Sequence, residues 1–308
     1  MRKRVLLIVG PTASGKTQLS LRMAETCGGE IVSADSRQIY RTMDIGTDKP
    51  SSIEMETVSH HCIDIKDPYE SFSAGEYGKL ARKIISEILA RGRIPIVVGG
   101  SGLYIRALVD GVFTGNFRDS ELRNGLRRKA DREGLDTLYN RLCEVDPSAA
   151  QKIHPNDQKR IIRALEVFEI SGEPISRIQE ERTEPADFVP QFWGILWSRK
   201  ILYERIERRV DEMIQSGLVQ EVEKLKEMGF GPEHNSLDSV GYKEVFAYLE
   251  DSIPFDEMVN RIKRNTRRFA KKQLTWFRRD PRIRWIELQE PVDWDKIALR
   301  IVDVYNRP

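Results

Sequence analysis

The sequence predicts an α/β protein in which a mostly parallel sheet is flanked by helices, with an all-helical domain inserted into this phosphate-loop core. Short apolar runs, helical patterns between them and a charged middle stretch without strand patterns support this fold class. The apolar runs are Val5–Val9, Glu30–Ala34 and Ile94–Val98. Each run is continuous rather than alternating, which is typical of parallel strands that are covered by helices on both faces.

A phosphate-loop pattern follows the first run directly. Residues 10–17 spell Gly-Pro-Thr-Ala-Ser-Gly-Lys-Thr, which fits GxxxxGK[ST], and 18–27 can continue as a helix. Backbone N–H groups of such a loop and the positive end of the helix dipole bind polyphosphates. Lys16 would bind the terminal phosphate, and the Thr17 hydroxyl would hold a Mg²⁺ ion. The pattern therefore predicts a site for a di- or triphosphate compound.

Helix signals predict several of the later elements. Ser73 and Glu76 can form a capping box, and the apolar spacing after them predicts a helix that ends at 91–92. The apolar stretch 192–197 is a candidate strand. A helical stretch is expected over 203–228, where apolar residues share one face.

The character of the chain changes after residue 115. From 117 to 186 it is charged and helix-patterned, and it ends in a loop-like Thr-Glu-Pro sequence. We therefore expect a core made of 1–116 and 187–308, with 117–186 as a helical insertion domain.

Composition sets limits on the cellular context. Lys and Arg number 50 against 48 Asp and Glu in 308 residues, so the net charge is close to zero and says little about partners. The three cysteines are far apart and form no CxxC pair, which fits a reducing cytoplasm and argues against a disulfide framework or zinc site. No apolar run approaches the length of a membrane span. We expect a cytoplasmic protein.

Charge is concentrated near the C-terminus, in a long helix predicted from Asp256 to about Arg278. Residues 261–284 contain eleven Lys or Arg and a single acid, Asp280, with aromatic residues interleaved. A basic face beside aromatics favours polyanion binding. A solvated surface helix whose aromatics belong to the core explains the same pattern.

Asp35 ends the second predicted strand and would lie beside the phosphate loop. A carboxylate there could hold Mg²⁺ or act as a general base, and a structural cap is the alternative. The third strand is followed by Gly-Gly-Ser-Gly at 99–102 and not by an acid. His60 and His61 lack metal-ligating partners at useful spacing, so we expect a hydrogen-bonded structural pair.

Further short segments follow one another along the chain in a characteristic order. They are Asp35-Ser36-Arg37-Gln38-Ile39-Tyr40, Met43-Asp44-Ile45-Gly46-Thr47-Asp48-Lys49-Pro50, His60-His61-Cys62-Ile63-Asp64, Phe72-Ser73-Ala74-Gly75, Val98-Gly99-Gly100-Ser101-Gly102-Leu103-Tyr104, His154-Pro155-Asn156-Asp157, Arg163-Ala164-Leu165-Glu166-Val167 and Val240-Gly241-Tyr242. Together with the phosphate loop they resemble the bacterial tRNA dimethylallyltransferases, also called tRNA isopentenyltransferases. The resemblance covers essentially the whole chain.

The resemblance implies that the dimethylallyl group of dimethylallyl diphosphate moves to the exocyclic N6 amine of adenine 37, in tRNAs that read codons beginning with U. It implies Mg²⁺ as cofactor, tRNA bound by its anticodon stem-loop, and no obligate protein partner, so that the enzyme works as a monomer. It places the diphosphate on Gly10, Thr12, Ala13, Ser14, Gly15, Lys16, Thr17 and Arg209, with Thr17 on the metal.

The resemblance also assigns roles in catalysis and RNA binding. Asp35 matches the general base, and Lys16, Ser101 and Arg209 complete the catalytic set. Ser101 stands where many relatives have threonine, so a hydroxyl is kept. The expected tRNA-binding residues are Asp35, Ser36, Arg37, Gln38, Ser101, Arg123, Lys159, Arg160, Ile161, Ile162 and Arg163.

Three other functions compete with this interpretation. A small-molecule kinase would use the same loop, but it leaves the insertion and the basic helix unexplained. An adenylate isopentenyltransferase would prenylate a free nucleotide, whereas the segment 154–157 and the basic helix favour RNA. A non-catalytic RNA-binding module would not need Asp35 beside an intact phosphate loop.

Overall fold

A computed structural model of the chain describes residues 3–113, 115 and 117–307. They form two compact units, one made of the described residues up to Val109 and from Ala186 onward, the other of Asp110–Pro185. The second unit thus begins seven residues before the boundary expected at 117. Each unit has a hydrophobic core of its own.

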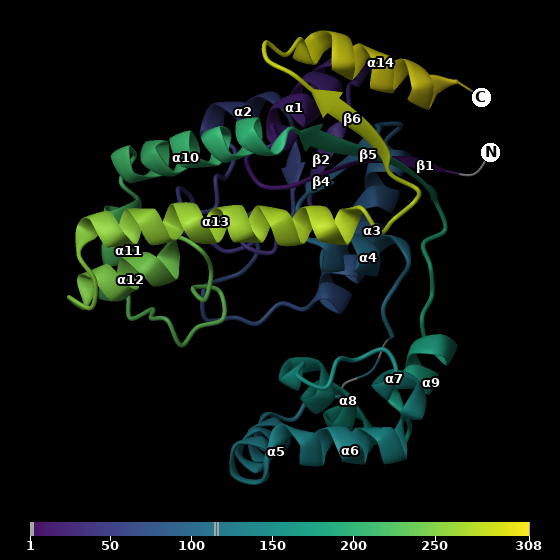
Figure 1. Cartoon of the computed structure of the whole chain (residues 1–308). Coiled ribbons are helices and arrows are strands. Elements are labelled where there is room, and N and C mark those ends of the chain that lie inside the picture. Colours follow the sequence, from purple (N-terminus) through teal and green to yellow (C-terminus); the bar gives the residue numbers. More distant parts are fainter. Residues whose placement is uncertain (1–2, 114, 116, 308) are drawn as a thin grey trace. The chain divides into compact units, whose positions relative to one another are not determined.

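The first unit is built on a six-stranded sheet in which every pair of neighbouring strands is parallel (Figure 1). The strands are β1 (Arg4–Val9), β2 (Glu30–Ser33), β3 (His60–His61), β4 (Pro95–Gly99), β5 (Val189–Trp197) and β6 (Arg284–Leu288), in the order β3-β2-β4-β1-β5-β6. The four strands expected from apolar runs are confirmed. β3 and β6 were not expected, because β3 has two residues and β6 has a mixed sequence.

Helices cover both faces of the sheet, which explains the continuous apolar strands. α1 (Lys16–Cys27) and α14 (Trp294–Asn306) pack together against one face, and α3 (Ala74–Ala90) and α4 (Gly102–Val109) pack against the other. The capping box of α3 is present: the Ser73 hydroxyl accepts from the Glu76 N–H, and the Glu76 carboxylate accepts from the Ser73 N–H.

A second group of helices lies beside the sheet. It consists of α2 (Ser52–Thr57), α10 (Arg199–Gln215), α11 (Leu218–Glu227), α12 (Tyr242–Leu249) and α13 (Phe255–Phe277). The helical stretch expected over 203–228 is two helices, because Gly217 adopts a φ of 99° and starts α11 in a new direction. The predicted last basic helix is confirmed as α13, which packs against α10 and α12 (Figure 1).

Helices are the only regular secondary structure in the described residues of the second unit, and loops connect them. Its helices are α5 (Ser120–Glu133), α6 (Leu135–Val145), α7 (Pro147–Ala150), α8 (Gln158–Ser171) and α9 (Ile175–Glu181). Leu126, Leu142, Ile161 and Ile178 belong to its core. No helix in the described part of the whole chain is long and apolar enough to cross a membrane.

A buried carboxylate fixes α5 against α8. Glu166 is fully buried, and its oxygens lie 2.8 and 2.9 Å from the Arg123 guanidinium and 2.7 Å from that of Arg163. It also accepts from the backbone N–H of Asp119 at 3.0 Å. Burial by itself would raise the pKa of Glu166, but the hydrogen bonds from both arginines outweigh it and lower the pKa below its ordinary value.

We predict that Glu166→Gln destabilises the second unit by about 3 kcal/mol, because it leaves two partly buried arginines without their anion. Hydrogen exchange of the α5 and α8 amides measures this loss, with Glu169→Gln on the exposed side of α8 as control. Because the folded pKa is depressed, the stabilisation is complete above the unfolded pKa and disappears as the pH falls through the folded value. Equal protection of the amides in both variants would contradict this role.

Candidate functional site

The phosphate loop joins β1 to α1, and its backbone includes left-handed conformations. Gly15 caps α1 with a φ of 88°, and Ala13 has a φ of 60°. A Cβ on Gly15 would lie 2.5 Å from the Trp294 ring. Both the left-handed backbone and this close packing therefore require glycine at position 15.

Side chains from distant elements hold the loop from outside. The Trp197 indole N–H donates to the Ser14 carbonyl at 2.9 Å, and the Arg205 Nε donates to the Ala13 carbonyl at 3.0 Å. The Arg205 guanidinium also lies over the Trp197 ring. These contacts occupy the carbonyls of Ala13 and Ser14 and fix the path of the loop.

Gln273 of α13 connects the loop to a second one. Its amide oxygen accepts from the Thr12 N–H at 2.8 Å, and its amide nitrogen donates to the Gly100 carbonyl at 3.0 Å. The side chain is buried. A Cβ on Gly100 would lie 2.2 Å from the Gln273 nitrogen. The loops after β1 and β4 are therefore fixed to α13 and to each other.

Lys16 supplies the first cation of the site. Its ammonium donates to the Pro11 carbonyl at 2.7 Å. Burial, followed by the nearby charge of Arg209, lowers the pKa of Lys16 to about 8, although Asp35 and Asp48 act in the opposite direction. An anion bound beside Lys16 would relieve this unfavourable environment.

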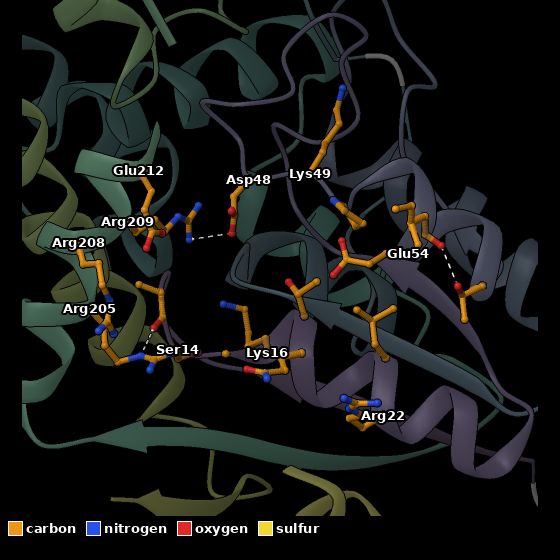
Figure 2. A pocket seen from close by; sticks show the side chains of 18 of the residues that line it. Ser14, Lys16, Arg22, Asp48, Lys49, Glu54, Arg205, Arg208, Arg209 and Glu212 are labelled. Carbon is orange, nitrogen blue, oxygen red and sulfur yellow. Dashed lines mark hydrogen bonds and ion pairs between the residues drawn. The ribbon is translucent and has the colours of Figure 1, made fainter. Parts of the chain in front are cut away.

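Arg209 of α10 supplies the second cation. It donates to the Thr12 hydroxyl at 2.7 Å and lies 3.3 Å from the Asp48 carboxylate. Lys16 and Arg209 face a cavity of about 660 Å³, whose wall also includes Arg205 and Arg208 (Figure 2). This arrangement of loop N–H groups and cations can bind a diphosphate.

Asp35 follows the end of β2, where its carboxylate accepts from the Arg37 N–H at 2.8 Å. The ends of β2 and β4 lie close together, because the Ser101 N–H donates to the Ala34 carbonyl at 3.2 Å. The Ser101 hydroxyl accepts from the Ser36 N–H at 3.1 Å. Asp35, Ser36 and Ser101 thus come to one wall.

Three neighbouring cavities share residues at the centre of the site. A small cavity of about 80 Å³ shares Lys16, Thr17, Asp48, Pro50 and Arg209 with the large one. The small cavity shares Thr12, Asp35, Thr47, Arg209 and Phe269 with a third cavity of about 460 Å³. We call these three cavities together the passage. Lys16 lines its large and small cavities, Asp35 lines its small and third cavities, and Arg209 lines all three.

Two expected RNA-binding residues already have partners. Arg37 donates to the carbonyls of Asn235 and Ser236. Gln38 accepts from the Ser33 hydroxyl and donates to the carbonyl of Asp48 at 2.9 Å. These contacts shape the wall of the site, and a direct role for either side chain in tRNA binding stays a prediction.

The expected residues of the second unit divide into two groups. Arg123 and Arg163 bind Glu166, while Ile161 and Ile162 are buried in the core, so these four side chains hold the unit together. Lys159 and Arg160 are exposed on α8. Arg160 also lies 3.4 Å from the Asp157 carboxylate, in an exposed pair. The contact of Lys159 and Arg160 with tRNA stays a prediction.

The structural interpretation of the histidine pair is confirmed. The His60 ring bonds the Val58 carbonyl and the His61 ring bonds Glu30, each at 2.7 Å. Within the described residues no group of three His, Cys, Asp or Glu could hold a metal ion. A Mg²⁺ ion held by the Thr17 hydroxyl stays a prediction; together with diphosphate oxygens and water, such a hydroxyl would form a donor set that this metal accepts.

The basic helix α13 combines both sequence interpretations. Lys263 and Arg267 pair with Asp211 and Glu207 of α10 and help to hold the helix in place, whereas Arg261 pairs with Glu257 within α13 itself. The outward side chains are exposed: Arg264, Arg268, Lys271 and Lys272 beside Phe269 and Trp276. Arg268, Phe269 and Lys272 line the third cavity. A basic rim thus surrounds the Asp35 side of the passage.

Sequence interpretation missed Gln273, Asp48 and Phe269. Gln273 lies within the basic stretch, where only charge and aromatic content drew attention. Asp48 lies in a segment that carries the family resemblance and Phe269 among the aromatics of the basic stretch, but neither was expected to line the site. They are far apart in the sequence, and only the fold brings them to one cavity.

Comparison with known proteins identifies the family of the chain. The family model for IPP transferases matches residues 38–280. The chain is 50% identical over 286 residues to a tRNA dimethylallyltransferase of Desulforudis audaxviator, covering 93% of this chain and 92% of that relative. The crystal structure of a full-length tRNA isopentenylpyrophosphate transferase from Bacillus halodurans matches with a TM-score of 0.73 and 41% identity, covering 99% and 96% of the two chains. A eukaryotic dimethylallyltransferase solved acting on tRNA matches with a TM-score of 0.83 and 29% identity, covering 99% and 80%.

We predict that diphosphate affinity depends on the protonation of Lys16. A bound anion stabilises the ammonium, so its pKa in the complex lies above the value of about 8 in the free site. Affinity for inorganic pyrophosphate should therefore be highest below pH 8 and fall about tenfold per pH unit above it. Calorimetric titration from about pH 6.5 to 9.5 measures this profile.

Lys16→Met serves as the control for that profile, because it keeps the length of the side chain and removes the charge. Subtracting its profile removes the ionisation of pyrophosphate itself. Identical pH profiles for the two proteins would show that Lys16 does not bind the anion.

Proposed function

The chain belongs to the IPP transferase family of tRNA dimethylallyltransferases, and we propose that its site joins dimethylallyl diphosphate to the N6 amine of adenine 37 across the passage described above. The activity is that of a prenyltransferase acting on tRNA. The donor, the position of the base and the roles of individual residues form the proposal. We expect the enzyme to act as a monomer in the cytoplasm.

The proposal rests on the difference between the two ends of the passage: Lys16 lines the large cavity and Asp35 lines the third cavity. The diphosphate occupies the end formed by the phosphate loop, Lys16 and Arg209, with its five-carbon group directed into the small cavity. The adenine enters from the third cavity, where Asp35 lies. The two reactants then meet among the five residues that both cavities share, which include Thr12, Asp35 and Arg209.

The cations act on the leaving group. Breaking the allylic carbon–oxygen bond leaves additional negative charge on the diphosphate. Lys16, Arg209 and the loop N–H groups are already placed around it, so they stabilise that charge without reorganising. Mg²⁺ held by Thr17 would neutralise further charge on the same oxygens.

Asp35 acts on the nucleophile. The lone pair of the adenine amine is delocalised into the ring, so the amine attacks well only as it loses a proton. One Asp35 oxygen accepts from the Arg37 N–H, which fixes the carboxylate and leaves the other oxygen to take that proton. Ser101, on the same wall, is placed to contact the base.

Access to the amine requires the base to leave the anticodon loop. Enzymes that modify a base extrude it into a pocket and hold the surrounding phosphates. The exposed Arg264, Arg268, Lys271 and Lys272 of α13 supply phosphate contacts at the rim, and Phe269 offers an aromatic face. Lys159 and Arg160 would bind the anticodon stem.

The direct test incubates the protein with dimethylallyl diphosphate, Mg²⁺ and unmodified tRNA, followed by mass analysis of the nucleosides. We expect one adenosine to gain the mass of a five-carbon prenyl group. Transfer of phosphate from ATP, or prenylation of free nucleotide with tRNA untouched, would reject the proposal in favour of a kinase or an adenylate isopentenyltransferase.

We predict that Asp35→Asn lowers the rate of a single turnover by about a hundredfold or more while tRNA binds with nearly unchanged affinity. Asparagine keeps an oxygen that accepts from the Arg37 N–H, so the wall keeps its shape. Rapid-quench measurement of bound substrates gives the rate, and filter binding gives the affinity. A variant that turns over normally but binds tRNA weakly would mean that Asp35 only positions the RNA.

We predict that replacing both Lys159 and Arg160 with Gln weakens tRNA binding and reduces the slope of log affinity against log salt by about 1 to 2. The Michaelis constant for the prenyl donor should stay unchanged. The charge-matched control replaces Lys129 and Arg132 of α5. Equal losses in both double variants would show that net charge matters and the position on α8 does not.

A further inference from the structure

An acid stands among the cations that bind the diphosphate. The Asp48 carboxylate lies 3.3 Å from Arg209, and Asp48 lines both the large and the small cavity together with Lys16 and Thr17 (Figure 2). Its side chain is 54% exposed toward this space. A negative charge here opposes the binding of a polyanion, so its presence calls for a reason.

The backbone at Asp48 indicates that its position is imposed by the surroundings. Asp48 has a φ of 56°, a left-handed conformation that costs energy for a residue with a Cβ. Such a conformation persists where neighbouring contacts determine it. The contacts of the segment 43–49 therefore decide whether the position of Asp48 is accidental.

Glu221 of α11 holds the first part of this segment. Its carboxylate accepts from the N–H groups of Asp44, Ile45 and Gly46 at 2.8, 2.7 and 3.1 Å. The Tyr242 hydroxyl donates to the same carboxylate at 2.6 Å. Four hydrogen bonds on one side chain leave this backbone no freedom to turn away from the site.

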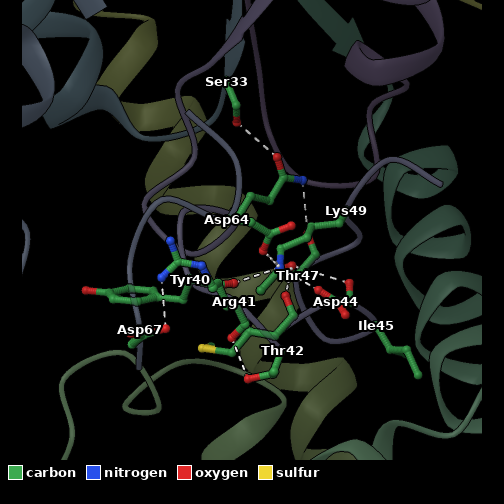
Figure 3. Close-up of polar contacts among 12 residues, drawn as sticks. Ser33, Tyr40, Arg41, Thr42, Asp44, Ile45, Thr47, Lys49, Asp64 and Asp67 are labelled. Atoms are coloured by element: carbon green, nitrogen blue, oxygen red, sulfur yellow. Dashed lines mark hydrogen bonds and ion pairs between the residues drawn. The ribbon is translucent and has the colours of Figure 1, made fainter. Parts of the chain in front are cut away.

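Lys49, whose contacts with Asp44 and Asp64 are drawn in Figure 3, and Gln38 hold the other part. The Lys49 side chain is 4% exposed, donates to the Tyr40 carbonyl at 2.7 Å and pairs with Asp44 and Asp64. Gln38 donates to the Asp48 carbonyl at 2.9 Å. Anchors on both sides of Asp48 thus direct its carboxylate to Arg209.

On the basis of the proposed function, we propose that Asp48 is a built-in competitor of diphosphate for Arg209, which weakens the binding of diphosphate and speeds its release after transfer. In the free site Arg209 is paired with Asp48. A diphosphate must take over this guanidinium and tolerate the carboxylate nearby. After prenyl transfer the same carboxylate reclaims Arg209 as pyrophosphate leaves.

The size of the effect follows from the exposure of the pair. An ion pair with an exposed carboxylate stabilises by at most about 1 kcal/mol, which corresponds to about fivefold in affinity. This is enough to tune product release without preventing the donor from binding. The alternative role, a second ligand beside Thr17 for the metal ion, predicts the opposite sign.

The test is Asp48→Asn, because asparagine tolerates the left-handed conformation and differs from aspartate only in charge. Calorimetry with inorganic pyrophosphate at fixed Mg²⁺ should give an affinity about fivefold tighter than wild type. Steady-state inhibition by pyrophosphate should strengthen by a similar factor. In the Arg209→Gln background the same substitution should change the affinity much less, since the competition is then absent.

Asp211→Asn is the matched control. Asp211 is on α10 near Arg209, but it pairs with Lys263 and does not line the cavities. This variant should change pyrophosphate affinity less than about twofold. Equal tightening in both variants would reduce the effect to net charge and overturn the proposal.

If Asp48→Asn bound pyrophosphate more weakly than wild type, the proposal would be overturned and Asp48 would be assigned as a metal ligand. Unchanged pyrophosphate affinity would overturn the proposal as well. These outcomes are distinct from failure of the proposed function. If the wild-type protein bound no pyrophosphate at all, the assignment of the diphosphate site itself would fail.

Discussion

The two hydrogen bonds of the Gln273 amide join the parts on which the site depends. They hold the Thr12 N–H of the phosphate loop and the Gly100 carbonyl after β4 to one buried side chain of α13. Losing either partner would leave a buried polar group unsatisfied, which costs about 1 to 3 kcal/mol. The helix that carries the exposed basic face therefore cannot shift without moving the diphosphate loop. The exposed basic face of α13 and the phosphate loop therefore share one rigid support.

This support keeps two positively charged side chains close together although they repel each other. Lys16 and Arg209 repel each other, and burial makes the ammonium less favourable still. Flexible side chains would swing into water. Here the Pro11 carbonyl and the Thr12 hydroxyl hold the two cations, while Asp35 and Asp48 offset part of the repulsion. The site is thus prepared for an anion before the anion arrives, which is what electrostatic catalysis requires.

Local sequence patterns predicted the parts whose structure is determined locally. Continuous apolar runs predicted β1, β2, β4 and β5, and GxxxxGK[ST] placed Lys16 at the start of α1. Contacts between distant segments were not predictable in this way. β6 has a mixed sequence and becomes a strand because β5 offers it an edge. Likewise Glu221 gives no sign in the sequence that three N–H groups from 44–46 bind it.

Ion pairs between acidic and basic side chains explain why the net charge of the chain, which is close to zero, does not reveal its basic surfaces. Glu166 is buried and pairs with Arg123 and Arg163, two of the residues expected to bind tRNA. In the folded chain their charges stabilise the second unit. On α13, three basic residues are likewise paired with acids of the first unit. A cation that holds the fold together must be partly buried and close to an acid, whereas one that binds RNA must stay exposed to reach a phosphate. Exposure in the folded structure, which composition does not reveal, identifies Lys159, Arg160 and the outward face of α13 as charges that a polyanion can reach, although Arg160 also pairs with the exposed Asp157.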